Sequence, residues 1–314
     1  MRRVLVPLDG SPLAASILPD AMQLAGKGGE LILISDPIGS MRGRAFPAQS
    51  EAEAVREALA DLEAHAAPLR EQGVAVETHA SVMLDPAYAI GTATRIYGAD
   101  MVACATHGRG PFGRLVRGGV AWRVLADSPV PVLIRHADAA AASRPIDARE
   151  ERILVPLDGS AYAEKALPLA QELADDWQAS LWLVHVVSRY PITELPQTEI
   201  APEAATDFQA QRSVQTYLDT LGAHLTGEVH AHVLFGSVLE SLIDATRAWG
   251  ISHVVMSSHG RTGLSRVLLG SVADELIHHL PCPIIVIPSH PLNAGPVREP
   301  EAMVPTATYH GQTS

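Results

Sequence analysis

Residues 257–272, SSHGRTGLSRVLLGSV, contain three glycines and two arginines but no acidic residue. Glycines allow backbone N–H groups to approach an anion closely, and arginines form strong charge-assisted hydrogen bonds with phosphate oxygens. A related stretch at residues 105–120, ATHGRGPFGRLVRGGV, is likewise rich in glycine and arginine and has no acidic residue. The whole chain is nevertheless acidic, with a formal net charge of −12 at pH 7. Both stretches therefore indicate phosphate binding.

Two familiar phosphate motifs do not fit these loops. The P-loop requires G-x-x-x-x-G-K-[ST], and neither stretch contains a lysine. The sequence GRGPFG from Gly108 matches G-x-G-x-x-G, but it follows a fourth strand-like run rather than a first, and the second stretch lacks it. A simpler interpretation stays open for Ser271, because Asp274 follows it at the spacing of a capping box.

The elements that must position these loops occur twice in the chain. The sequence from Arg2, RRVLVPLDGSPLAASILPDAMQLA, is matched from Glu151 by ERILVPLDGSAYAEKALPLAQELA, which pairs Asp9 with Asp158. A nearly constant register over a whole half predicts a duplicated domain. The expected segments are a first domain at 1–136, a linker at 137–149, a second domain at 150–288 and a proline-rich, disordered tail at 289–314.

Each half alternates short strand-like runs with stretches of helical spacing. In the second half the runs are RILVPL, SLWLVHVV, EVHAHVLF, SHVVMS and PIIVIP. Ser11 and Ser160 stand where helix N-caps are expected. Five strands alternating with helices predict an α/β domain with a parallel sheet covered on both faces. Ligands bind such sheets at the carboxyl ends of the strands, where the PLDGS loop and the glycine loop should meet.

Composition narrows the functional class. The chain has 314 residues, of which 47% are hydrophobic and 18% charged, as in a globular protein. Its negative net charge argues against a surface that binds nucleic acid or anionic membranes. No apolar run is long enough to span a bilayer. The two cysteines, Cys104 and Cys282, suit buried positions in a reducing compartment, so we expect a cytoplasmic protein. Histidine-rich runs such as HAHVL lack matching ligands, so no metal site is predicted.

At this point the residues resemble the universal stress protein family in its tandem two-domain form. The family's nucleotide signature is G-x-x-G, a nine-residue spacer and then G-[ST]. The second half has Ser257 in place of the first glycine, then Gly260, the spacer 261–269, Gly270 and Ser271. The resemblance covers residues 1–136 and 150–288 and implies two flavodoxin-like (Rossmann-like) domains, each with the strand order 3-2-1-4-5.

The resemblance also implies that ATP lies across the strand ends of the second half. Carried over by position, Asp158 and the backbone of Val186 would face the adenine. The adenosine pocket would be lined by Pro156, Met256 and Ser257, and the phosphates would be held by Gly260, Gly270, Ser271 and Val272. Mg²⁺ is left open, because phosphate oxygens and water would hold most of its coordination sites.

The first half matches the signature less well. It keeps Pro7, Asp9 and Gly108, but its motif ends in Gly118 and Gly119, without the final hydroxyl. The position of Val186 is taken by Asp36, which would put a carboxylate near the base or end the strand early. We therefore expect the first site to be weaker or empty.

The resulting hypothesis is an ATP-binding module whose occupancy regulates partners or stress survival. Its two domains would pair through their last strands, PVPVLIR and PCPIIVIP, with a further homodimer left open. One alternative is a slow ATPase or autophosphorylating enzyme that uses Ser271 or Ser265, although no carboxylate in the loop offers a base. The other is a structural protein with two degenerate sites.

Overall fold

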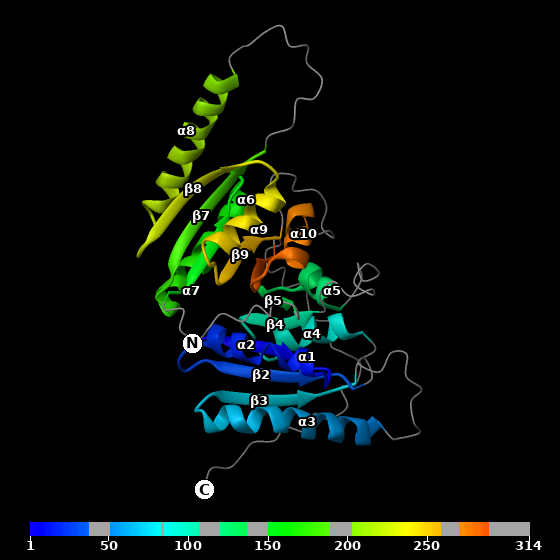
Figure 1. Ribbon diagram of the computed structural model, residues 1–314. Coiled ribbons are helices and arrows are strands. Elements are labelled where there is room, and N and C mark those ends of the chain that lie inside the picture. Colours follow the sequence, from blue (N-terminus) through cyan, green and yellow to red (C-terminus); the bar gives the residue numbers. More distant parts are fainter. Residues whose placement is uncertain are drawn as a thin grey trace. The chain divides into compact units, whose positions relative to one another are not determined.

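The computed structural model describes residues 1–37, 51–82, 85–106, 120–136, 150–188, 203–258 and 270–288 (Figure 1). These residues form two compact units, one before residue 137 and the other after residue 149. Each unit is an α/β domain, and the two have the same order of elements.

The first unit is built on a parallel sheet with the order β3-β2-β1-β4-β5. Its strands are β1 (Arg3–Pro7), β2 (Glu30–Ser35), β3 (Ala75–Ala80), β4 (Met101–Thr106) and β5 (Val132–His136). Its helices are α1 (Pro12–Ala15), α2 (Leu18–Ala25), α3 (Glu51–Glu71), α4 (Pro86–Ile96) and α5 (Val120–Asp127). Val4, Leu5 and Val6 of β1 are all fully buried, which requires that both faces of the sheet be covered.

The second unit repeats this order as β8-β7-β6-β9-β10, again with parallel pairs. Its strands are β6 (Arg152–Pro156), β7 (Ser180–Val187), β8 (Val229–Phe235), β9 (His253–Ser257) and β10 (Ile284–Ile287). Its helices are α6 (Ala161–Glu164), α7 (Ala166–Trp177), α8 (Glu203–Gly222), α9 (Val238–Ala248) and α10 (Ser271–His279). The predicted fold class and the order 3-2-1-4-5 are therefore confirmed in each unit.

The turn after the first strand is built in the same way in both units. Ser11 Oγ accepts a hydrogen bond from the backbone N of Ala14 at 3.1 Å, and Ser160 Oγ accepts one from that of Ala163 at 3.2 Å. These bonds satisfy N–H groups in the first turn of the helix, so the two predicted N-caps are confirmed.

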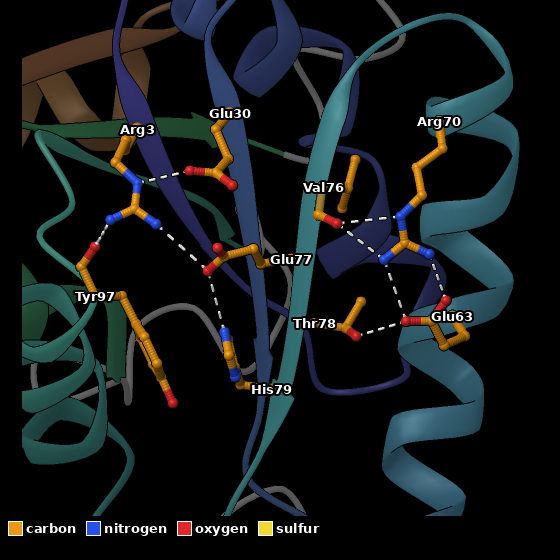
Figure 2. Close-up of polar contacts among 9 residues, drawn as sticks. All are labelled: Arg3, Glu30, Glu63, Arg70, Val76, Glu77, Thr78, His79 and Tyr97. Carbon is orange, nitrogen blue, oxygen red and sulfur yellow. Dashed lines mark hydrogen bonds and ion pairs between the residues drawn. The ribbon is translucent and has the colours of Figure 1, made fainter. Parts of the chain in front are cut away.

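Ion pairs of one arginine join strands β1, β2 and β3 of the first unit's sheet (Figure 2). Arg3 Nε lies 2.6 Å from Glu30 Oε2 on β2, and Arg3 Nη2 lies 3.3 Å from Glu77 Oε2 on β3. The same guanidinium donates to the carbonyl oxygen of Tyr97, just after α4. One arginine on β1 thus links two strands and a helix end.

Helix α3 is attached to β3 by a second polar group, shown on the right of Figure 2. Glu63 accepts hydrogen bonds from Arg70 Nη1 at 2.5 Å and from Thr78 Oγ1 at 2.6 Å. The bond from Arg70, and then the one from Thr78, lowers the pKa of Glu63 against the opposing effect of its partial burial. Glu63 is therefore most stabilising in its ionised form.

In the second unit, His230 on β8 takes the place of Glu77 and lies in a cluster of aromatic rings. Trp182 on β7 lies 4.3 Å from His230 and 5.0 Å from Trp249, measured between ring centroids. His232 packs on Trp249 at 4.6 Å, and burial lowers its pKa. Arg152 Nη1 donates to the carbonyl oxygen of Trp249 at 2.6 Å, as Arg3 donates to that of Tyr97, and His79 stacks on Tyr97 in the first unit. The two units therefore share this arginine bond and a histidine ring contact, and they differ in the carboxylates of the first unit and in Trp182.

Candidate functional site

The second unit brings five of the predicted residues to one end of its sheet. Strand β6 pairs with β7 on one side and with β9 on the other, so the strand order reverses beside β6. Pro156 ends β6, Asp158 follows it, and Val186 lies near the end of β7. Met256 and Ser257 end β9, and both are buried. This is the position at which open α/β sheets bind ligands.

The carboxylate of Asp158 is held by the turn that it starts. Its Oδ1 atom accepts hydrogen bonds from the backbone N of Ser160 at 3.0 Å and from Ser160 Oγ at 2.6 Å. Gly159 between them has φ +81°, a backbone conformation that residues with a Cβ rarely adopt. The turn and the cap hold the half-buried Asp158 side chain within its own loop after β6.

Helix α10 begins beside the end of β9. The backbone N of Gly270 donates to the carbonyl oxygen of Ser258 at 2.9 Å, and the N of Ser258 donates to that of Ile287 at 2.8 Å. Gly270 is the N-cap residue of α10 and Ser271 is its first helical residue. The alternative that Ser271 caps this helix is therefore wrong. Val272, the next residue, is exposed.

Other predicted site residues lie outside the described part of the chain. These are Gly260 in the second half and Gly108, Gly118 and Gly119 in the first. The backbone of Ser271 is described, within α10.

One neighbour of the site was missed by sequence reasoning. Tyr217 on α8 donates from Oη to Glu164 Oε1 on α6 at 3.0 Å. Partial burial, and after it the bond to Glu164, raises the pKa of Tyr217, and the charge of Asp158 contributes in the same direction. The two bonded residues lie 53 positions apart, so no local pattern could have indicated the contact.

The corresponding end of the first unit has a similar turn but different surroundings. Asp9 Oδ1 accepts from the backbone N of Ser11 at 3.0 Å and from Ser11 Oγ at 2.5 Å, after β1 has ended at Pro7. Pro7 pairs with Ile34 as Pro156 pairs with Val184, so Asp36 occupies the position of Val186. Strand β2 ends at Ser35, just before Asp36, whereas β7 continues through Val186 to Val187.

Two features are absent from the residues that the structure describes. Among them, no group of three or more His, Cys, Asp or Glu side chains is arranged to hold a metal ion. None of the helices described has both the length and the apolar character needed to cross a membrane.

Comparisons with known proteins all point to one protein family. The model of the universal stress protein family matches residues 1–136 and 150–288. Universal stress protein Rv2005c of Mycobacterium tuberculosis is 28% identical over 227 residues, which cover 71% of this chain and 74% of the relative. Universal stress protein MJ0531 of Methanocaldococcus jannaschii is 28% identical over 142 residues, or 44% of this chain and 81% of the relative.

A solved structure shows the same fold. The crystal structure of a universal stress protein from Archaeoglobus fulgidus has a TM-score of 0.64 to this chain. The alignment covers 92% of this chain and 98% of that chain, at 22% sequence identity.

Proposed function

The chain belongs to the universal stress protein family, and on this premise we propose that its second unit binds ATP at the carboxyl ends of β6, β7 and β9. The observation that carries the proposal is the hydrogen bond from Gly270 to Ser258. It sets the N-terminus of α10 beside the end of β9, next to the strand that leads to Asp158. Helix N-termini attract phosphate through their unpaired N–H groups and the positive end of the helix dipole.

The residues suit the two ends of ATP. The Asp158 carboxylate can accept a hydrogen bond from the 6-amino group of adenine, and the backbone of Val186 can complete the recognition of the base. Ser257 is small and only 4% exposed, so it can stand near the ribose where the family signature has glycine. Pro156 and Met256 would line the adenosine pocket. The phosphates would be held by Gly260, Gly270, Ser271 and Val272, with Mg²⁺ carried by the phosphate oxygens and water.

The first unit is proposed to bind nucleotide weakly or not at all. Asp36 offers a carboxylate where Val186 stands in the second unit, and the final hydroxyl of the signature is missing at Gly119. We expect one ATP per chain.

The biological part of the proposal is regulation through nucleotide occupancy, with a downstream protein partner. A cytoplasmic location fits a nucleotide-binding protein whose Cys104 and Cys282 are both buried, and burial raises the pKa of the Cys104 thiol to about 12. The net charge of −12 disfavours binding of the protein to nucleic acid, which is also negatively charged. Pairing of the two domains through their last strands, and a homodimer beyond it, stay predictions.

Equilibrium dialysis with labelled ATP tests the proposal. The wild type should bind one ATP, and Gly270→Asp should abolish binding by placing a negative charge at the phosphate end. Gly91→Asp is the matched control, because a Cβ at Gly91 in α4 meets no atom within 4 Å. Failure of the wild type to bind, or unchanged binding by Gly270→Asp, would overturn the proposal. Release of phosphate that is lost in Ser271→Ala would favour the slow ATPase instead.

A further inference from the structure

Tyr217 joins the elements that carry the base end of the proposed site. It lies on α8, where the next residue, Leu218, is fully buried and anchors the helix. Its hydroxyl donates to Glu164 at the end of α6, at 3.0 Å. Tyr217 therefore ties α8 to the short helix α6, and the backbone N of Glu164 donates to the carbonyl oxygen of Ser160 at the end of the Asp158 loop.

The ring of Tyr217 also reaches the neighbouring strand. Its centroid lies 6.5 Å from that of His185 on β7, with an edge-to-face angle of 82°. His185 directly precedes Val186 on this strand. One side chain thus contacts the short helix that follows the Asp158 loop and the residue next to Val186, and Asp158 and Val186 are the two groups proposed to face adenine.

The first unit has no such bridge at the corresponding positions. Leu62 of α3 is fully buried, as Leu218 is, and the residue before it is Asp61 rather than tyrosine. Asp61 Oδ2 lies 3.8 Å from the point where a Cβ on Gly10 would stand. Glu164 is replaced by Ala15, which has no side-chain acceptor. A carboxylate therefore lies beside the first loop in the place where a phenol holds the second.

We propose that Tyr217 is a positioning residue that fixes the loop carrying Asp158 and thereby sets the preference of this site for adenine over guanine nucleotides. The inference rests on the proposed function. Adenine presents a 6-amino donor to the carboxylate, whereas guanine presents a 6-oxo acceptor, which a fixed carboxylate repels. A loop freed from Tyr217 can move Asp158 away from the base, so selectivity falls together with affinity.

The decisive variant is Tyr217→Phe, which keeps the ring against His185 and removes only the hydroxyl. ATP affinity should fall by about 2- to 10-fold, because binding must then order a loop that the part-buried hydrogen bond no longer holds. The ratio of ATP to GTP affinity should fall at least about threefold, while binding of inorganic tripolyphosphate should not change. Tyr162→Phe is the matched control, because Tyr162 on α6 is exposed and its ring lies under Lys165.

The outcomes separate this inference from the proposed function. Failure of the wild type to bind ATP would overturn both. Wild-type binding with an unchanged affinity and ATP-to-GTP ratio in Tyr217→Phe would overturn the inference alone. An equal loss of ATP, GTP and tripolyphosphate binding would also overturn it, because a general loss of structure has that effect. Glu164→Gln can still accept the tyrosine hydrogen bond, so it should fold and lose less affinity than Tyr217→Phe.

Discussion

Replacing Asp158 with asparagine separates recognition of the base from stability of the turn. In the wild type, one carboxylate oxygen accepts both hydrogen bonds from Ser160, at 3.0 Å and 2.6 Å. The amide oxygen of asparagine can accept the same two bonds without the charge, so the free energy of unfolding should fall by no more than about 2 kcal/mol. The amide NH₂ group then faces the base, and it opposes the 6-amino donor of adenine.

The loss of a hydrogen bond to a charged group sets the size of the effect on binding. Such bonds contribute about 1.5–3 kcal/mol, which corresponds to a rise of about 10- to 150-fold in the Kd for ATP. GTP should be affected in the opposite direction, because its 6-oxo group can accept from the new NH₂ group. Isothermal titration calorimetry with both nucleotides measures the two changes, and urea unfolding measures stability.

The control for this experiment is Asp244→Asn on α9, which makes the same change of charge at an exposed position of the same unit. It should leave both Kd values within about twofold of the wild type, since exposed surface charges contribute little. An unchanged Kd for ATP in Asp158→Asn, or equal losses for ATP and GTP, would show that Asp158 does not face the base.

Two further predictions concern the fold. A Cβ at Gly29 would overlap the carbonyl oxygen of Ala25 and lie 2.8 Å from that of Arg2, so Gly29→Ala should destabilise the protein by about 2–3 kcal/mol in urea unfolding. A Cβ at Gly91 within α4 meets open space, so Gly91→Ala should stabilise the protein by about 0.5–1 kcal/mol. A Gly29→Ala variant more stable than Gly91→Ala would contradict this reasoning. The pKa of Glu63 is lowered from 4.5, so its stabilising contribution is complete above the unfolded pKa and is lost as pH falls through the folded pKa. Glu63→Gln should therefore be less stable than the wild type at about pH 7, with a difference that shrinks below about pH 4 and is not constant across the range.

Much of the fold could be predicted because its signals are local or repeated. The caps at Ser11 and Ser160 depend on residues three positions apart, and the alternation of strands with helices indicated a parallel α/β sheet. The strand order needed more than alternation, and the family resemblance supplied it. The carboxyl ends of β6 and β9 then followed as the place for a ligand.

Side-chain contacts between distant segments could not be predicted in the same way. The bond from Tyr217 to Glu164 spans 53 positions, and the ion pair from Arg3 to Glu77 joins strands that are not neighbours in the sequence. The capping interpretation of Ser271 failed for a different reason. The capping-box pattern requires Ser271 to precede the first helical residue, whereas the helix begins at Ser271 itself, after Gly270.

The PLDGS sequence by itself is weak evidence for nucleotide binding. In both units its aspartate and serine make the same turn and the same helix cap, with nearly equal hydrogen-bond lengths, so a requirement of folding explains the motif in each half. The residues that distinguish the units lie outside the motif: Val186 against Asp36, Glu164 against Ala15, and Tyr217 against Asp61. Two of these three differences add a carboxylate to the first unit beside the place proposed for the base. The proposed difference in ATP binding between the units therefore depends on these surroundings more than on the shared loop, and exchanging Tyr217 tests that dependence directly.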